Sequence, residues 1–263
     1  MTPSHQAVLE KIIAVLAADA RIVGVAASGS CASGAADEFS DLDLVIAVEP
    51  DDYAVVSAQR KLIAARMGKL LAAFTGEHVG EPRLLICLFD EPLMHVDLKF
   101  VSLPDAAARV DETRIVWQRD GRLSDTLAQG EARYPAPDPQ WIEDRFWIWT
   151  HYCATKIGRG ELFEALDFLA FLRWRALGPL MLMAVGAQPN GVRRIEQLAP
   201  ADAARLEATI ALHERASCLA ALEACVRLYD ELRAPHLSAQ PPGDAARAAA
   251  LAYLAGIKSR PAA

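Results

Sequence analysis

Residues 41–48, DLDLVIAV, constrain the fold more than any other part of the chain. Leucine, isoleucine and valine at alternate positions form one apolar face, and Val45 and Ala47 bring apolar character to the other. A strand that is apolar on both faces is typical of a sheet with other elements packed on both sides. We therefore expect this strand to be covered on both faces.

Helix and strand patterns alternate through the first hundred residues. The predicted helices cover residues 4–18 and 52–74, and the further predicted strands cover 22–27, 83–89 and 93–101. Asp90-Glu91-Pro92 predicts a hairpin turn between the last two strands, and residues 28–36 form a loop of small residues after the first strand. Residues 104–137 have a mixed pattern, and the proline-rich segment 134–139 is the best candidate for a linker.

The remainder of the chain has a helical pattern. The predicted helices cover residues 141–157, 161–185 (with a kink at Pro179), 200–233 and 244–259. Breaker segments at 158–160 and 235–243 separate them. We therefore predict an α+β protein of two domains, a mixed sheet flanked by helices over residues 1–137 and a helical bundle over residues 138–263.

Composition excludes several classes of protein. With 27 Lys and Arg against 34 Asp and Glu, the net charge of −7 does not favour nucleic-acid binding, which needs a cationic surface. A hydrophobic fraction of 53% excludes a largely disordered chain. No apolar run reaches the roughly 18 residues that span a bilayer, so we expect no membrane contact. Five cysteines without a CxxC pair indicate reduced thiols and a cytoplasmic location.

The excess acid lies in residues 1–103, which hold 14 acidic and 8 basic residues. Two explanations fit this asymmetry. The acidic residues are an ordinary solvated surface, or some of them are gathered for metal ions or a cationic substrate.

Asp41 and Asp43 follow the small-residue loop that contains Gly29 and Ser30. Two carboxylates two positions apart on a strand point to the same face. Backbone N–H groups of such a loop can cradle a phosphate. Two close carboxylates repel each other unless a cation lies between them, and Mg²⁺ is commonly bound by one or two carboxylates together with phosphate oxygens. The arrangement therefore suits a Mg²⁺–nucleotide complex.

The strand over residues 93–101 carries a second group of ionisable residues. Its alternation places His95, Asp97 and Lys99 on one face and apolar residues on the other. Such a face is either solvent-exposed or part of a site, and the nearby aspartates favour a site. Asp97 is then either a third carboxylate for two metal ions or the general base for a hydroxyl nucleophile. Lys99 either balances the charge of the carboxylates or contacts a phosphate.

Gly29-Ser30, the later Ser40-Asp41-Leu42-Asp43 and Asp97 together resemble the DNA polymerase β-type nucleotidyltransferase superfamily. The likeness covers about residues 20–101. Within it, the motif is similar to the one found in bacterial aminoglycoside and lincosamide nucleotidyltransferases and in minimal nucleotidyltransferases. The helical remainder is similar in layout only. The sequence departs from the usual pattern at Ser28, where an apolar or aromatic residue is common, and at Ser33, where many members carry arginine.

The resemblance implies a polymerase β-like catalytic domain followed by a helical domain. It implies that Gly29, Ser30 and Ser40 bind the nucleotide, and that Asp41, Asp43 and Asp97 bind two Mg²⁺ ions. Helical domains of related enzymes offer a lysine to the triphosphate, and Lys156 takes that place here. Tyr152, not an acid, precedes it by one turn, so no base is implied there. The alternative for Lys156 is a surface lysine near a helix end.

The sequence thus predicts a Mg²⁺-dependent nucleotidyltransferase that moves AMP from ATP, or another nucleoside monophosphate, onto a hydroxyl of a small molecule. An aminoglycoside-type antibiotic is the acceptor class that the resemblance implies. Two alternatives stay open: a nucleotidyltransferase acting on a protein or tRNA, as in toxin–antitoxin pairs, and a nucleotide-binding module without catalysis. The sequence shows no basic stripe for tRNA, and it leaves open a homo-oligomer.

Overall fold

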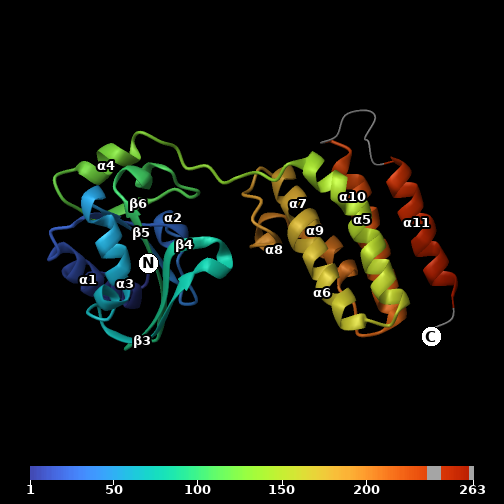
Figure 1. The fold of residues 1–263 in the computed structure, drawn as a ribbon, viewed down its shortest axis with the longest axis horizontal. Helices are drawn as coiled ribbons and strands as arrows, with labels where there is room; N and C mark the ends of the chain where they lie inside the picture. Colours follow the sequence, from blue (N-terminus) through green and yellow to red (C-terminus); the bar gives the residue numbers. More distant parts are fainter. Residues whose placement is uncertain (236–243, 261–263) are drawn as a thin grey trace. The chain divides into compact units, whose positions relative to one another are not determined.

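The computed structural model describes residues 1–235 and 244–260. The chain divides into two units, residues 1–134 and residues 135–263 (Figure 1). Each unit has its own hydrophobic core. The first unit is a sheet with helices, and the second consists of helices, so the predicted α+β class is confirmed. Apart from Pro235, the breaker segment expected at 235–243 lies outside the described residues.

The first unit is built on a six-stranded sheet in the order β3-β4-β5-β2-β1-β6. Strands β2 and β5 are parallel neighbours, and the other neighbouring pairs are antiparallel, so the sheet is mixed. The strands are β1 (Ile22–Ala27), β2 (Leu42–Val48), β3 (Lys69–Gly76), β4 (Glu81–Asp90), β5 (Met94–Ser102) and β6 (Arg114–Gln118). The expected hairpin joins β4 to β5.

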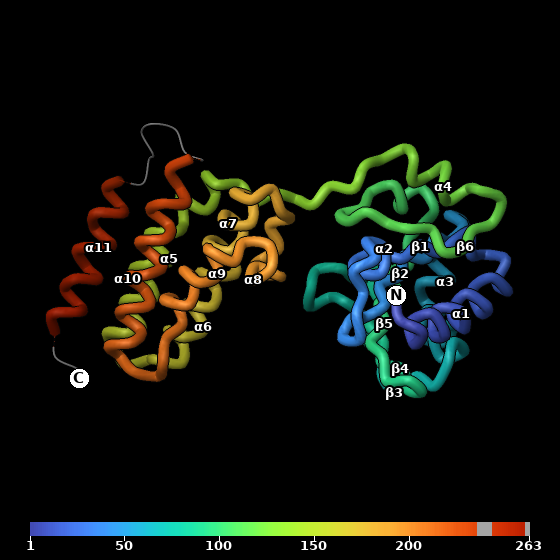
Figure 2. The backbone as a smooth tube through the Cα atoms, turned by 180° about the vertical axis from the view of Figure 1, so that it is seen from behind, coloured from blue at the N-terminus to red at the C-terminus, as the bar shows by residue number. Residues whose placement is uncertain are grey.

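Helices α1 (Pro3–Ala17) and α3 (Tyr53–Ala64) cover one face of the sheet (Figures 1 and 2). Alternate residues of β2 and β5, including Leu44 and Leu98, are fully buried against them. The opposite face is covered near β1 by α4 (Arg122–Leu127) and the 3-10 segment η3 (Pro104–Ala107). Val45 and Ala47 pack there, so β2 is covered on both faces as expected.

Beyond this second cluster, the same face of β2 and β5 carries polar residues rather than apolar ones. Asp43, Asp97 and Lys99 lie there, each partly buried. A short helix, α2 (Gly29–Ser33), follows β1 at this end of the sheet, so the loop expected over residues 28–36 is helical in part. The fold therefore leaves a polar region on this face of β2 and β5.

Two strands of the sheet differ from the sequence-based expectation. The helix predicted over 52–74 is wrong beyond residue 64, because α3 ends at Ala64 and β3 begins at Lys69. Residues 69–76, KLLAAFTG, lack the alternation of a half-buried strand because β3 lies at the sheet edge and is largely exposed. Pairing with β4 decides its conformation, and such tertiary context overrides local propensity. Strand β6 lies within the segment 104–137, where the pattern was mixed.

The second unit contains helices α5 (Pro139–Gly158), α6 (Leu162–Leu172), α7 (Gly178–Ala184), α8 (Ile195–Leu198), α9 (Pro200–Leu206), α10 (Arg215–Arg233) and α11 (Asp244–Ser259). Asp138 caps α5 by accepting a hydrogen bond from the backbone N–H of Gln140 at 2.9 Å. Within the described parts of the chain, no helix has the length and hydrophobicity to cross a membrane. Short 3-10 segments complete the chain at Pro50–Asp52, Glu77–Val79 and Glu207–Thr209.

Two predicted helices of this unit are altered. Residues 161–185 pass through a π-helical turn, Arg173–Leu177, and Pro179 then falls in the first turn of α7, where a missing N–H costs little. The single helix predicted over 200–233 is wrong, because α9 ends at Leu206 and α10 begins at Arg215. A guanidinium N–H of Arg173 donates to the carbonyl of Thr209 at 2.6 Å and satisfies a backbone group in the break.

A buried polar network joins three of these helices. Glu143 of α5, only 1% exposed, accepts hydrogen bonds from Trp147 Nε1 at 2.9 Å, Tyr229 Oη at 2.8 Å and Arg233 at 2.8 Å. Arg233 of α10 also lies 3.4 Å from Asp244 at the start of α11. The carboxylate is therefore fully desolvated but compensated by three donors.

Candidate functional site

The loop after β1 meets β2 at Gly29. The φ of Gly29 is +58°, in the left-handed region that favours glycine. A Cβ atom at this position would lie 2.5 Å from Oδ2 of Asp43. The neighbouring Ser28 N–H donates to the Asp43 carbonyl at 2.9 Å. The glycine of the Gly-Ser pair therefore allows the loop backbone to approach the Asp43 carboxylate.

Ser30, the second residue of the pair, has a buried hydroxyl. Its Oγ has no hydrogen-bond partner among the residues that the structure describes. A buried hydroxyl without a partner is destabilising, so such a group is expected to meet a ligand or an ordered water. An acceptor oxygen of a phosphate would satisfy it.

Ser40 and Asp41 precede β2. The hydroxyl of Ser40 donates to Asp37 Oδ1 at 2.9 Å, so it is bonded within its own turn. The carbonyl of Asp41 accepts a weak hydrogen bond from Cys31 Sγ at 3.7 Å. Burial raises the pKa of the Asp97 carboxyl most, and the charge of Asp41 raises it further. The charge of Asp41 therefore acts on Asp97, whereas the Ser40 hydroxyl is engaged in its own turn.

Asp43 and Asp97 are register partners on the parallel strands β2 and β5. The Asp97 side chain is 20% exposed, and its Oδ1 lies 2.8 Å from Nε2 of His95. Burial raises the pKa of the Asp97 carboxyl most, and contact with His95 lowers it in part. The structure thus brings two carboxylates together from distant parts of the sequence.

Lys99 lies two residues after Asp97 on β5, on the same face of the strand. Its Nζ lies 2.8 Å from Oε2 of Glu81, the first residue of β4. Arg83 donates two hydrogen bonds of 2.7 Å to the same carboxylate. These contacts, that with Arg83 foremost, lower the pKa of Glu81 to about 2. Lys99 is therefore held by an ionised glutamate beside Asp97.

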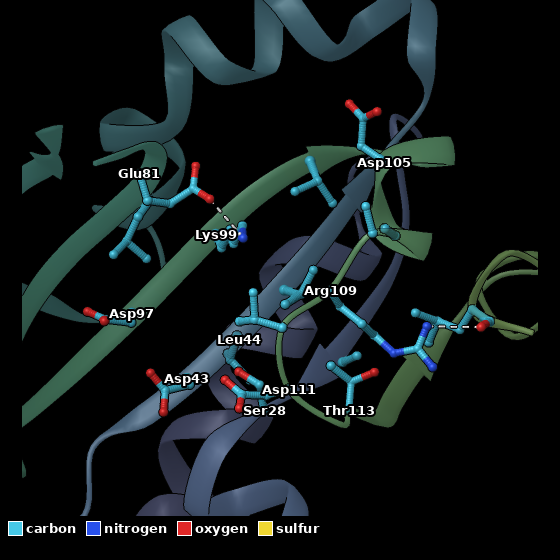
Figure 3. Close-up of a pocket in the computed structure, with 18 of the residues that line it drawn as sticks. Ser28, Asp43, Leu44, Glu81, Asp97, Lys99, Asp105, Arg109, Asp111 and Thr113 are labelled. Atoms are coloured by element: carbon cyan, nitrogen blue, oxygen red, sulfur yellow. Dashed lines mark hydrogen bonds and ion pairs between the residues drawn. The ribbon is translucent and has the colours of Figure 1, made fainter. Parts of the chain in front are cut away.

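A cavity of about 180 Å³ adjoins these residues. Figure 3 shows Asp43 on β2 and Asp97 and Lys99 on β5, which line one side of the cavity. Asp105, Arg109 and Asp111 line it from the segment after β5. Arg109 points away from the carboxylates and donates to the carbonyls of Leu127 and Gly130, each at 3.0 Å. Within residues 1–235 and 244–260, no three His, Cys, Asp or Glu side chains are grouped closely enough to hold a metal ion. The three-carboxylate metal site stays a prediction.

The sequence model of the streptomycin adenylyltransferase family matches residues 2–239. The chain belongs to the streptomycin adenylyltransferase family. It is therefore a nucleotidyltransferase, as the sequence predicts. No curated protein matches its sequence.

Two solved structures are similar to this streptomycin adenylyltransferase family member, each with a TM-score of 0.40. One is an aminoglycoside 6-adenyltransferase from Bacillus subtilis, at 18% identity, with 98% of this chain and 100% of that chain covered. The other is a nucleotidyltransferase-like protein from Exiguobacterium sibiricum 255-15, at 14% identity, with 98% and 81% covered. At this TM-score neither likeness decides the site.

In this adenylyltransferase family member, Lys156 belongs to the second unit and is 14% exposed. Its Nζ lies 2.7 Å from Glu161 and 3.0 Å from Glu164, and 5.1 Å from the ring centre of Tyr152. Tyr152 in turn donates to Glu164. Glu161, and then Glu164, raise the pKa of Lys156. The lysine is thus held in a local ionic cluster of α5 and α6, and its contact with a nucleotide stays a prediction.

Several residues around the cavity of this adenylyltransferase family member are not singled out by sequence patterns. Glu81 begins β4 and is bonded by Arg83, and Asp105 and Asp111 lie in the mixed segment after β5. No motif marks these residues. The pairing of β4 with β5 brings Glu81 to the site, and the path of the segment after β5 brings Asp105 and Asp111 there. The contact between His95 and Asp97 depends on side-chain rotamers, although alternation already places both residues on one face.

Proposed function

We propose that this protein transfers AMP from Mg·ATP to a hydroxyl group of an aminoglycoside-type antibiotic and releases pyrophosphate. One observation supports this reaction above all. Asp43 and Asp97 are paired across parallel strands on a polar region of the sheet, next to the Gly29-Ser30 loop and the cavity. Paired carboxylates beside a phosphate-binding loop suit nucleotidyl transfer.

The residues present fit a metal–nucleotide complex. Gly29 leaves space for the backbone to meet a ligand beside Asp43, and the unpartnered hydroxyl of Ser30 suits a phosphate oxygen. In the proposal, the bound nucleotide completes the site: Asp41, Asp43 and Asp97 would then hold Mg²⁺ together with phosphate oxygens, and the ion would stabilise negative charge on the transferring phosphoryl group and on the leaving oxygen. Lys99 adds a positive charge beside them, and in the proposal it exchanges Glu81 for a phosphate oxygen when nucleotide binds.

The transfer forms a bond between the acceptor oxygen and the α-phosphorus and breaks the bond to the pyrophosphate oxygen. The acceptor hydroxyl loses its proton in this step. Asp97 suits the role of proton acceptor, since its carboxylate lines the cavity and burial raises its pKa. Metal ligation is the second role open to Asp97, and the experiments below separate the two.

The charge around the cavity supports a cationic acceptor. Five carboxylates contribute to its lining, from Asp43, Glu81, Asp97, Asp105 and Asp111. The two cations of the lining are engaged, Lys99 with Glu81 and Arg109 with backbone carbonyls. Aminoglycosides carry several ammonium groups, so their charge is complementary to this lining. The same charge disfavours tRNA, the acceptor in the alternative proposal.

A cytoplasmic location fits the chemistry of the cysteines. All five are free and buried, and burial raises the pKa of Cys87, Cys153 and Cys225 to about 12. Such thiols are inert and suit a reducing compartment.

The test is acceptor-dependent pyrophosphate release from Mg·ATP across a panel of aminoglycosides, lincosamides, tRNA and proteins. We expect release with an aminoglycoside, at least a hundredfold reduction in Asp43→Ala, and no change in the control Asp125→Asn, which is outside the cavity lining. Asp97→Asn should still bind Mg·ATP but lose most of the transfer rate if Asp97 is the base. Release with no member of the panel, or full activity of Asp43→Ala, would overturn the proposal.

Lys156→Ala separates the nucleotide role of the second unit from its local ionic cluster. If Lys156 contacts the triphosphate, the Kd for Mg·ATP rises in Lys156→Ala and stays unchanged in Glu161→Gln. An equal Kd in Lys156→Ala and the natural protein would return Lys156 to a purely structural role.

A further inference from the structure

We propose that His95 is a positioning residue that fixes the orientation of the Asp97 carboxylate in the candidate site. The inference rests on the proposed role of Asp97 in nucleotidyl transfer. His95 itself touches neither the nucleotide nor the acceptor in this proposal. It acts by engaging one oxygen of Asp97, so that the other is presented to the metal ion or to the acceptor proton.

The strand geometry brings the two residues together. His95 and Asp97 are two positions apart on β5 and therefore share the polar face of the sheet. Nε2 of His95 lies 2.8 Å from Oδ1 of Asp97. An ionised carboxylate can only accept, so the ring N–H donates. In the described part of the chain, His95 is the one hydrogen-bond donor to this carboxylate.

The surroundings of Asp97 supply no other polar restraint from the neighbouring strand. In the register of β4 and β5, Ile86 lies opposite Asp97 and Leu88 lies opposite His95. On the other side, the register partner of Asp97 is Asp43, which repels it when both are ionised. The terminal torsion of aspartate is broad, so a carboxylate without a donor samples several orientations. The hydrogen bond from His95 selects one.

The engaged oxygen leaves Oδ2 for the reaction. Charge-assisted hydrogen bonds are short and directional, and they hold carboxylates and metal ligands in productive orientations in many sites. The His95 side chain is half exposed, so it contributes little to the core. A substitution at His95 therefore changes the orientation of Asp97 without removing packing from the sheet.

The experiment compares His95→Leu, which removes the donor, with His95→Gln, whose amide N–H can replace Nε2. It uses the full chain and two measurements, Mn²⁺ binding by electron paramagnetic resonance and kcat and KM for transfer. His78→Leu is the control, because His78 is another histidine of the same unit and lies outside the cavity lining. Thermal unfolding checks that every variant is folded.

We expect His95→Leu to lower Mn²⁺ affinity if Asp97 is a ligand, or kcat with little change in KM if Asp97 is the base. The expected effect is about tenfold to a hundredfold, as for other residues that orient ligands. His95→Gln should restore most of the loss, and His78→Leu should show none. In an Asp97→Asn background, His95→Leu should add nothing, because the residue on which it acts is already altered.

Unchanged Mn²⁺ affinity and unchanged kcat in His95→Leu would overturn the inference. So would an effect that persists in full in the Asp97→Asn background, or one that His95→Gln does not relieve. Mn²⁺ binding does not need an acceptor, so a protein that transfers nothing to the panel still yields a result for His95. A failed proposed function and a failed role for His95 are therefore distinguishable.

Discussion

Two independent constraints disfavour any residue other than glycine at position 29. Its φ of +58° strains any residue with a Cβ, and that Cβ would lie 2.5 Å from the Asp43 carboxylate. Gly34 has a φ of +76° but open space at the same place. We expect Gly34→Ala to lose about 1–2 kcal/mol of unfolding free energy from backbone strain alone. Gly29→Ala should lose this amount and also the binding of a non-hydrolysable Mg·ATP analogue.

Urea unfolding and calorimetric titration of the analogue measure both effects. The comparison isolates the contact with Asp43, since the strain is common to the two variants. Equal nucleotide affinity in Gly29→Ala and Gly34→Ala would mean that the loop does not hold the nucleotide through its approach to Asp43.

At the scale of residues, the sequence predicts what depends on alternation and cannot predict what depends on register. The burial pattern of β5 confirms that His95, Asp97 and Lys99 share a face opposite the apolar residues. Pairing of Lys99 with Glu81, by contrast, requires a particular alignment of β4 with β5. A one-residue shift of that alignment would turn β4 over, and the local sequence does not specify it.

At the scale of elements, the Glu143 network makes the contact of α5, α10 and α11 sensitive to one charge. Glu143→Gln removes the charge but keeps the size, so the buried Arg233 loses its nearer carboxylate and keeps only the 3.4 Å pair with the exposed Asp244. We expect a loss of about 3 kcal/mol of unfolding free energy. Glu223→Gln removes an exposed pair with Lys258 and should cost less than about 1 kcal/mol.

Chemical denaturation of both variants, followed by tryptophan fluorescence, gives these values directly. Trp147 reports on the network, since its indole N–H donates to Glu143. If Glu143→Gln is no less stable than Glu223→Gln, the network does not stabilise the three helices.

Among the elements, those with a clear period and a marked end were predictable. The sequences of strand β2 and helix α5 combine a regular hydrophobic pattern with turn or capping residues. Strand β3 was not predictable, because its alanine-rich sequence continues the helical pattern of α3 and its pairing with β4 is non-local. In the break between α9 and α10, the carbonyl of Thr209 is likewise bonded by Arg173, which is distant in sequence.

At the scale of the whole molecule, the two units have separate cores. We propose that residues 1–137 form the catalytic domain and that residues 138–263 cover the nucleotide and acceptor. Residues 1–137 alone should unfold cooperatively in urea and bind Mg·ATP, because their core and candidate site are contained within them. They should not transfer AMP to an acceptor. A fragment without a cooperative transition would contradict the independence of this unit.

The parallel pairing of β2 with β5 has a consequence for folding kinetics. Asp43 and Asp97 become neighbours only after α3, β3 and β4 have been traversed and β5 has joined β2. Such non-local pairing forms slowly, because the entropy of closing the intervening chain is lost before the contacts form. A ligand that contacts the carboxylates of both strands therefore binds the native state and not its partly folded precursors. By mass action, the substrate of this enzyme would favour the completion of its own binding site.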